Sequence, residues 1–475
     1  MKKTIVFFFA FLCSICMYAK EYPIKQYIVT VTEPGTLAQE IGKVVPAAIS
    51  SFGLSVKGPI NENDFETLCI LGEGKLWVLN LTDAQIEDNI LPDYAFATIL
   101  ESDGLRYWTP RIKKIILPEG LSEIGEGAFK DYFSLEEVVL PSSLTKIGDY
   151  AFAGCTALTE IKLPESLETI DVASFSDCTS LQKVVLPSSL KKIRRYAFDR
   201  SGLQSIDFPN GLKEIGKNAF SNTKIEKIEI PESCIYLREA AFENDSLLKE
   251  AIVPPSVKKI PVACFRNCVS IEKFEIAEGI TLVDAFAFEN CTSLKELKLA
   301  ESVKFYNQKA FYNHAMEELR LPEYFYGRMV GIKAFYGAKP LTKIYSESRI
   351  TPYFNYFDVY DSECPLGLNT SSRDLPIYVP VGTAKDYRVM LGWKFFTNFI
   401  ETEDFPTSGV AEVESTDGIR VENGIVLNNG AEIVKIYNLN GVEIYSGNDK
   451  SISGLMPGIY LISLKDSQPQ KIIIK

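Results

Sequence analysis

The chain has 475 residues, of which 46% are hydrophobic and 24% are charged, and its formal net charge is -12. This composition is typical of a folded protein and argues against a chain that is largely disordered. The negative net charge argues against nucleic acid as a general partner and against an anionic membrane surface, because both attract basic proteins.

The N-terminal residues have the pattern of a secretory signal peptide. Lysines at positions 2 and 3 precede an apolar run over residues 4–18, and Ala19 is a suitable site for signal peptidase I. Cys13 raises the alternative of a lipoprotein, but the bulky Leu12 stands where a lipidation motif requires a small residue. No later stretch of the sequence is long enough and apolar enough to form a transmembrane segment. We therefore predict that residues 1–19 are a cleaved signal peptide and that the mature chain is exported to the cell surface or the extracellular space, in association with the outer membrane.

Residues 20–110 are expected to form an N-terminal cap for the repeat that follows. A helix is predicted around residues 36–52. The segment GKLWVLNLTDAQI at 74–86 has the apolar spacing of a divergent repeat coil, and LPDYAF at 91–96 ends in the same Ala-Phe pair as the later coils.

The middle of the chain is organised by a phenylalanine that recurs every 22 to 24 residues. Such a fixed period is the sequence signature of a repeat architecture. The positions are Phe129, Phe152, Phe175, Phe198, Phe220, Phe242, Phe265, Phe288, Phe311 and Phe335.

Each repeat reads as one coil of a solenoid. In LTEIKLPESLETIDVASF, residues 158–175, the spacing apolar-x-x-apolar-x-apolar predicts a short strand, and Pro164 marks its end because proline cannot donate to a strand ladder. The following leucine, isoleucine and phenylalanine are expected to point inward. A unit of this size cannot bury its apolar face alone, so each coil must stack on the next and share one continuous core.

The consensus L-x-x-I-x-L-P-x-S-L-x-x-I-G-x-x-A-F-x-x-C over residues 111–346 resembles the BspA-like, or treponemal-type, leucine-rich repeats of bacterial surface proteins. The resemblance implies an α/β-type solenoid that is mostly β: a curved leucine-rich-repeat array of about ten coils with N- and C-terminal caps. It also implies an exported protein with an adhesive or host-binding role. The repeat itself encodes no enzyme.

Residues beyond the array are expected to form a C-terminal cap, a linker and a small β-sandwich. The cap, 347–405, contains a predicted strand, a short helix and a tryptophan within 375–401. Residues 406–418 are small, polar and acidic, as in a linker, and 419–475 alternate apolar with polar residues around Asn-Gly and Pro-Gly turns. This last segment, which ends in KIIIK, resembles the C-terminal sorting domain of the type IX secretion system. A generic immunoglobulin-like module is the alternative.

Catalytic and metal-binding patterns are weak in this sequence, so we expect no catalytic residue, no cofactor and no metal. The single histidine, His314, lies three residues after Phe311, at the position that Cys155 occupies after Phe152. We call this position the turn slot. Cys264 and Cys268 lack the further ligands that a zinc site requires, and no phosphate-binding loop is present. A hydrolase built on paired carboxylates remains a third functional class.

The turn slot is filled by chemically different residues, which indicates a structural role. Its cysteines, Cys155, Cys178, Cys268 and Cys291, are interpreted as small buried hydrophobes. Disulfides between neighbouring coils, such as Cys155 with Cys178, are the alternative, although stacked side chains fit disulfide geometry poorly.

The outward positions of the strands supply the first candidate binding surface. We predict cross-strand ion pairs among the alternating charges Lys227, Glu250, Lys273 and Glu296, on a face that binds an extracellular protein from the host matrix or a bacterial surface. The full column of outward positions is Lys114, Glu137, Glu160, Lys183, Ser205, Lys227, Glu250, Lys273, Glu296 and Glu318, and a neighbouring column includes Asp207, Glu229, Ile252, Glu275 and Lys298.

An aromatic-rich segment near the end of the array supplies the second candidate surface. Tyrosine and phenylalanine are enriched at binding surfaces, so a glycan-binding protein is the alternative function. The candidate residues are Tyr324, Tyr326, Tyr353, Phe354, Tyr356 and Tyr360. Some aromatic residues of this region, which also includes Tyr306, Phe325 and Tyr345, are expected instead to close the solenoid core.

Overall fold

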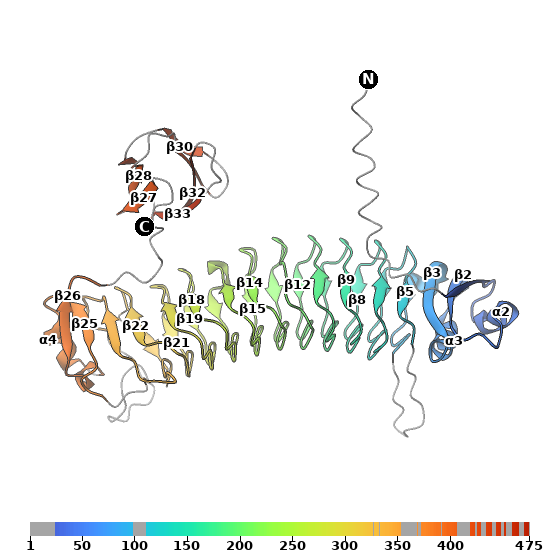
Figure 1. The fold of residues 1–475 in the computed structure, drawn as a ribbon, viewed down its shortest axis with the longest axis horizontal. Helices are drawn as coiled ribbons and strands as arrows, with labels where there is room; N and C mark the ends of the chain where they lie inside the picture. The colour runs from blue at the N-terminus through green and yellow to red at the C-terminus, as the bar shows by residue number, and fades with distance from the viewer. Residues whose placement is uncertain are drawn as a thin grey trace. The chain divides into compact units, whose positions relative to one another are not determined.

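The computed structural model describes residues 24–97, 111–325, 327–331, 333–352, 368, 372–390 and 392–405, together with the strands between residues 419 and 474. The chain divides into two compact units, Met1–Glu403 and Asp404–Lys475 (Figure 1). The predicted signal peptide and the predicted linker lie outside the described residues.

The first unit begins with a parallel sheet that leads into the repeat. Strands β1 (Lys25–Thr30), β2 (Phe52–Ile60) and β3 (Leu76–Ile86) pair in order, and β3 pairs with the first strand of the array. Helices α2 (Leu37–Val44) and α3 (Glu62–Gly72) connect these strands at this end of the array (Figure 1). The helix predicted over 36–52 is shorter than expected, because Val45 is extended ahead of Pro46. Helix α3 had no counterpart in the sequence prediction.

A buried aspartate fastens the two helices to each other. The carboxylate of Asp64 accepts hydrogen bonds from the backbone of Asn61, as part of a capping box, and from the backbone of Gly35 and Leu37. This side chain therefore caps α3 and positions the start of α2.

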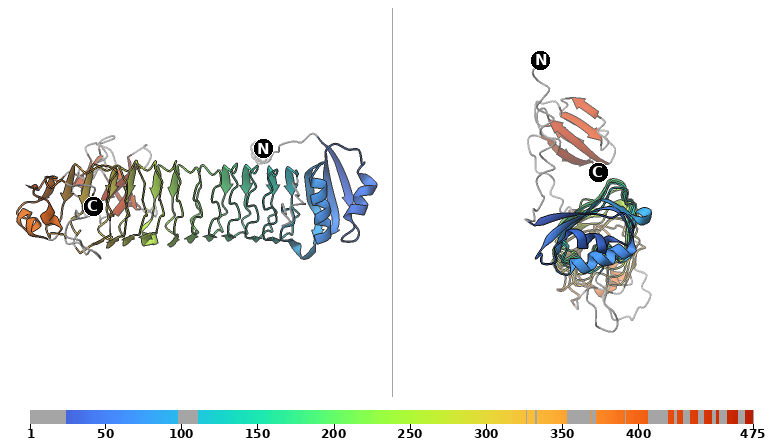
Figure 2. Two further views of the ribbon diagram at one scale, coloured as in Figure 1. Left: turned by 90° about the horizontal axis from the view of Figure 1, so that it is seen from below. Right: turned by 90° about the vertical axis from the view of Figure 1, so that its right-hand side faces the viewer.

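The coils of the array contribute strands to two faces (Figure 2). The long-strand face starts at β5 and consists mainly of three-residue strands with a buried central residue. Its strands are β5 (Lys114–Ile116), β7 (Glu137–Val139), β9 (Glu160–Lys162), β11 (Lys183–Val185), β14 (Lys227–Glu229), β16 (Glu250–Ile252), β18 (Lys273–Glu275), β20 (Glu296–Lys298), β22 (Glu318–Leu321) and β24 (Lys343–Ser346).

The short-strand face consists of two-residue strands from the other side of each coil. Its strands pair in parallel, in the segments β4-β6-β8, β10-β12-β13-β15 and β17-β19-β21-β23. They are β4 (Ile90–Leu91), β6 (Glu123–Ile124), β8 (Lys146–Ile147), β10 (Thr169–Ile170), β12 (Lys192–Ile193), β13 (Glu214–Ile215), β15 (Tyr236–Leu237), β17 (Lys259–Ile260), β19 (Leu282–Val283), β21 (Phe305–Tyr306) and β23 (Met329–Val330).

One predicted strand is missing from the long-strand face. The repeat predicts a strand around Ser205 and Asp207, but the structure has none there. The coils before and after this segment have 22 residues, one fewer than most of the others. The backbone hydrogen bonds between neighbouring coils are longer here. The hydrogen bonds from Gln204 N to Gln182 O and from Glu226 N to Gln204 O are both 3.4 Å long, whereas the equivalent bond from Lys249 N is 2.8 Å.

The core of the array is a continuous stack of phenylalanine rings. Adjacent rings from Phe96 to Phe335 have centroids 4.9 to 5.8 Å apart and interplanar angles of 2 to 22°. All of these side chains are buried. The position used to count the repeat is therefore the central contact between coils, and the solenoid predicted from it is confirmed.

The segment after the array contains the strand and the short helix predicted within residues 375–401, and also a 3-10 helix and a second strand that were not predicted. They are β25 (Ile377–Pro380), α4 (Ala384–Val389), the short 3-10 helix η4 (Trp393–Phe395) and β26 (Phe399–Thr402), and β25 pairs with both β24 and β26. Trp393 is fully buried and its indole N–H donates to the carbonyl of Pro352 at 2.8 Å. Their role as a terminal cap stays a prediction.

The second unit contains two antiparallel sheets, with strand orders β27-β28-β31 and β30-β29-β32-β33. The strands are β27 (Ile419–Glu422), β28 (Ile425–Asn428), β29 (Val434–Asn438), β30 (Glu443–Gly447), β31 (Ser451–Ile452), β32 (Gly458–Leu464) and β33 (Gln470–Ile474). Antiparallel pairing agrees with the alternating sequence pattern. The β-sandwich and its sorting role stay predictions.

Candidate binding surfaces

The four charged residues predicted for the long-strand face lie on adjacent strands. Lys227 Nζ is 2.9 Å from Glu250 Oε1, and Lys273 Nζ is 2.8 Å from Glu296 Oε2. Their side chains are between 53 and 68% exposed. The predicted ion pairs are therefore confirmed, and the role of these residues in binding stays a prediction.

The neighbouring column adds an apolar residue to this charged surface. Ile252 is 44% exposed, between the exposed Glu229 and Glu275 of the adjacent strands, and Glu275 forms an ion pair with Lys298. Exposed ion pairs contribute only a few tenths of a kcal/mol to stability. Their main effect here is to hold charges of both signs at fixed positions around one exposed isoleucine.

The aromatic candidates divide between the surface and the core. Tyr324 is 50% exposed. Tyr306, Phe325 and Tyr345 are buried, which confirms that aromatic residues of this region contribute to the solenoid core. The other candidates lie outside the described residues: Tyr326, Tyr353, Phe354, Tyr356 and Tyr360.

A ladder of asparagine side chains, which the apolar spacing of the sequence does not predict, follows the edge of five coils. Each member lies two residues after a core phenylalanine and has a positive φ between 60 and 65°. Asparagine tolerates this left-handed conformation better than most residues. The side-chain amides of Asn244, Asn267, Asn290 and Asn313 each donate to the side-chain oxygen of the preceding member, at 2.7 to 3.0 Å. The signal that could have identified it is the recurring pair Phe-x-Asn.

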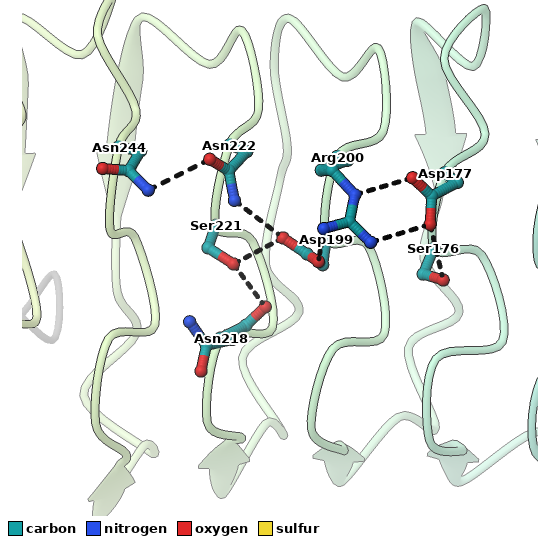
Figure 3. A network of polar contacts seen from close by, with 8 residues as sticks. All are labelled: Ser176, Asp177, Asp199, Arg200, Asn218, Ser221, Asn222 and Asn244. Atoms are coloured by element: carbon teal, nitrogen blue, oxygen red, sulfur yellow. Dashed lines mark hydrogen bonds and ion pairs between the residues drawn. The ribbon is translucent and has the colours of Figure 1, made fainter.

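The asparagine ladder ends at a buried carboxylate (Figure 3). Asp199 accepts hydrogen bonds from Asn222 at 2.9 Å and from the hydroxyl of Ser221 at 2.7 Å. The guanidinium of the adjacent Arg200 makes two hydrogen bonds to the carboxylate of Asp177 in the preceding coil. Both carboxylates and the guanidinium drawn here are therefore engaged by groups of the same chain, as expected for a structural network.

The turn-slot cysteines are free thiols that bond to the neighbouring coil. Cys155, Cys178, Cys268 and Cys291 are fully buried. Each sulfur donates to the carbonyl of the core phenylalanine in the preceding coil, at 3.1 to 3.2 Å. Burial raises the pKa of all four thiols well above its usual range. These residues are structural, as predicted, and the disulfide alternative is wrong for them.

His314 is also engaged by the backbone. Its Nδ1 accepts a hydrogen bond from Met316 N at 3.0 Å, and its Nε2 lies 3.2 Å from Phe335 O. Burial lowers the pKa of the imidazole to about 4. The ring is therefore neutral at pH 7. Within the part of the chain that the structure describes, no group of three or more potential ligands is arranged to hold a metal ion.

These features agree with the family comparison. The family described as the BspA type leucine rich repeat region matches residues 102–223, 173–284 and 258–357, which together span more than half of the chain. The chain belongs to the BspA-type leucine-rich-repeat family. The resemblance found in the sequence is confirmed. A comparison with curated proteins finds no match.

Solved structures of bacterial repeat proteins are similar to this chain. A leucine-rich-repeat protein from Bacteroides ovatus is 20% identical, with a TM-score of 0.41, and the match covers 59% of this chain and 64% of that one, just under two thirds of its length. The pneumococcal vaccine antigen PcpA is 20% identical, with a TM-score of 0.40, and coverage is 68% of this chain and 87% of that one. A leucine rich cell surface protein from Faecalibacterium prausnitzii is 23% identical, with a TM-score of 0.26, and coverage is 46% and 79%.

None of the helices in the described part of the chain is long and apolar enough to cross a membrane.

Proposed function

We propose that this BspA-type protein is exported and binds an extracellular protein, without catalysis, through the long-strand face. The observation that carries the proposal is that two ion pairs, Lys227–Glu250 and Lys273–Glu296, lie beside the exposed Ile252. Complementary charges give a protein interface specificity and a fast association rate. An exposed apolar residue at the centre of a polar surface has the arrangement expected of an interface core and its rim.

The scaffold makes this surface rigid. The central residues of the strands, such as Ile228, Ala251 and Phe274, are buried, and the strands of each pair are joined in parallel register. A rigid surface loses little conformational entropy when it binds. The turn-slot thiols and His314, which are candidate nucleophiles and bases, are buried and bonded to the backbone, which favours binding over thiol- or histidine-based catalysis.

The proposal is tested by measuring binding of the full chain to a panel of immobilised extracellular matrix proteins and bacterial surface polysaccharides. We expect binding to a matrix protein that weakens about tenfold when Glu250 is replaced by lysine, and that weakens again when salt is raised from about 0.05 to about 0.5 M. Glu232→Lys is the matched control, because it makes the same charge change at an exposed residue off the strand. Binding only to a polysaccharide, or equal losses in both variants, contradicts the proposal.

The ends of the chain have a separate role in this proposal. Residues 1–19 direct export, and residues 419–475 act as a secretion and sorting domain. The antiparallel pairing of β29 with β30 and of β32 with β33 supports a folded module at this position. Deleting residues 410–475 is expected to prevent display of the protein on the cell surface. Unaltered display of the truncated chain contradicts the sorting role.

A further inference from the structure

The short-strand face carries a strip of positive charge that differs from the balanced charge of the long-strand face. The strip runs from the coil of β12 to the coil of β17. Its members are Lys191, Lys192, Arg195, Lys213, Lys258 and Lys259, and all but the half-buried Lys191 are exposed. Among the residues that the structure describes, no ion pair joins these six side chains to a carboxylate.

Lysines of the long-strand face are more often paired than those of the strip. On the long-strand face, Lys114 pairs with Glu137 at 2.7 Å, and the lysines at 227, 273 and 298 also pair with glutamates of adjacent coils. On the long-strand face only the strand lysines Lys162 and Lys183 have no ion pair among the described residues, whereas the strip groups six such cations between the coils of β12 and β17. The chain has a net charge of -12, so the strip is a local region whose charge is opposite to that of the whole protein.

The geometry of the strip fits a linear polymer. Strands β12, β13 and β15 pair in parallel register, so Lys192, Glu214 and Tyr236 lie side by side along the array. Neighbouring strands are about 4.8 Å apart, and the cations fall in two adjacent columns. The column before the strands contains Lys191, Lys213 and Lys258, and the strand column contains Lys192 and Lys259 with Glu214 and Tyr236 between them. Each strand contributes only two residues, so the strip is long and narrow.

The centre of the strip adds an exposed ring. Tyr236 is 49% exposed and Ile235 is 48% exposed. The guanidinium of Arg238 lies 4.8 Å from the centroid of the tyrosine ring and is itself held by Glu214 at 2.8 Å. An aromatic ring held in this way offers an apolar surface on which the C–H face of a sugar can pack.

Negative charge bounds the strip on its N-terminal side. A hollow on the same face, over the coils of β6, β8 and β10, has a net negative lining. It contains the carboxylates of Asp93, Glu123, Glu126, Asp149, Glu168 and Asp171, and two cations, Lys146 and Arg194, which pair with Glu123 and Asp171. A polyanion is repelled there, so its bound segment is confined to the coils from Lys191 to Lys259.

We propose that this basic strip binds a linear acidic polysaccharide, with lysines and Arg195 contacting its carboxylate or sulfate groups and Tyr236 packing against a sugar ring. A single-stranded nucleic acid is less well matched, because it requires a series of rings for successive bases and the strip presents only one at its centre. This site lies on a different face from the proposed protein-binding surface and is independent of it.

The test uses the full chain with heparin and polygalacturonate as acidic probes, dextran as a neutral probe and a single-stranded DNA oligomer. We expect salt-dependent binding to an acidic polysaccharide, no binding to dextran, and an affinity about 100-fold lower in the triple variant Lys192→Glu, Lys213→Glu, Lys259→Glu. The triple variant Lys192→Arg, Lys213→Arg, Lys259→Arg is expected to bind like the wild type, because the charge is kept. Tyr236→Ala is expected to weaken polysaccharide binding about tenfold without changing the salt dependence.

A control separates the strip from net charge. The triple variant Lys57→Glu, Lys249→Glu, Lys295→Glu changes the net charge by the same amount at lysines that are paired with carboxylates elsewhere. We expect it to keep heparin affinity within about threefold of the wild type, because distant exposed charges are screened. Three results would overturn the proposal: equal losses of heparin affinity in the two lysine-to-glutamate variants, no binding to either acidic polysaccharide, or tighter binding to DNA than to the polysaccharides. The variant Glu250→Lys should lose matrix-protein binding and keep heparin binding. This result would show that the basic strip and the long-strand face are separate sites.

Discussion

The side-chain amide of Asn267 donates to the side-chain oxygen of Asn244, 2.7 Å away in the preceding coil. Asn267 also accepts a hydrogen bond from Asn290 at 2.8 Å, and its φ is 63°. One residue type therefore meets two requirements at this position: a left-handed backbone and a side chain that donates and accepts at once. This explains why asparagine recurs at five consecutive coils, whereas the turn slot one residue later varies.

Replacing Asn267 by alanine is expected to destabilise the array by about 2 to 3 kcal/mol. The variant loses two side-chain hydrogen bonds and places a β-carbon in the left-handed region. The free energy of unfolding in urea measures the effect. Asn267→Gly is the control, because glycine adopts the same φ without strain, and it should be about 1 kcal/mol more stable than the alanine variant. If the two variants were equally stable, the left-handed backbone conformation would not be the reason for asparagine at this position.

The turn-slot thiols are expected to be unreactive in the folded protein. Cys155, Cys178, Cys268 and Cys291 are fully buried, and burial raises the pKa of each thiol, so little thiolate is available at pH 8. Peptide mapping after treatment with a maleimide should find these four cysteines unmodified in buffer and modified in urea. Rapid labelling in buffer, or a disulfide-linked peptide containing Cys155 and Cys178, contradicts this account.

His314 should make the stability depend on pH between about 6.5 and about 4. Its pKa is lowered by burial to about 4 in the folded state, so the unfolded chain takes up a proton first as the pH falls. The stabilising contribution is complete above the unfolded pKa and is lost as the pH decreases toward the folded one. Between pH 7.5 and pH 5 the loss should be about 2 kcal/mol.

The variant His314→Cys isolates this effect, since cysteine fills the same slot in the neighbouring coil as Cys291. Urea unfolding at the two pH values should show a smaller decrease for the variant than for the wild type. The same decrease in both proteins would mean that the histidine is not the titrating group.

Asp245 should have the opposite dependence on pH. Its carboxyl occupies the turn slot, and Oδ1 accepts hydrogen bonds from the backbone and hydroxyl of Thr223. Oδ2 is buried and has no hydrogen-bond partner among the described residues. Desolvation by burial raises its pKa well above the usual range. The stability that it contributes is present below the unfolded pKa and lost as the pH rises.

Asp245→Asn is therefore expected to stabilise the protein by about 1 to 3 kcal/mol at pH 8, because it removes a buried charge and keeps an acceptor for Thr223. The gain should be much smaller at pH 4. Thermal unfolding of both proteins at the two pH values measures it. An asparagine variant that is less stable than the wild type at pH 8 contradicts the burial argument.

The sequence predicts the solenoid well because the core position is the same in every coil. Phe152 and its equivalents are identical residues at a fixed period, and their burial follows from the need of each coil to cover its neighbour. The ion pairs Lys227–Glu250 and Lys273–Glu296 were predictable for the same reason, since the period places these residues on adjacent strands.

Features that depend on local backbone geometry were not predictable in this way. The asparagine ladder requires a left-handed residue two positions after each phenylalanine, and that conformation is not visible in hydrophobic spacing. The missing strand around Ser205 results from coils one residue shorter, which stretch hydrogen bonds without changing the apolar pattern. The count of aromatic residues near the array end could not separate the buried Tyr345 from the exposed Tyr324.

The most direct test of the central claim is to exchange the charges on the long-strand face. The variant Lys227→Glu, Glu250→Lys, Lys273→Glu, Glu296→Lys preserves the net charge and allows both ion pairs to re-form in reverse. Its free energy of unfolding should lie within about 1 kcal/mol of the wild type. Its affinity for the matrix protein that the wild type binds, measured by surface plasmon resonance, should fall about tenfold or more. An unchanged affinity in this folded variant would contradict a binding role for the long-strand face.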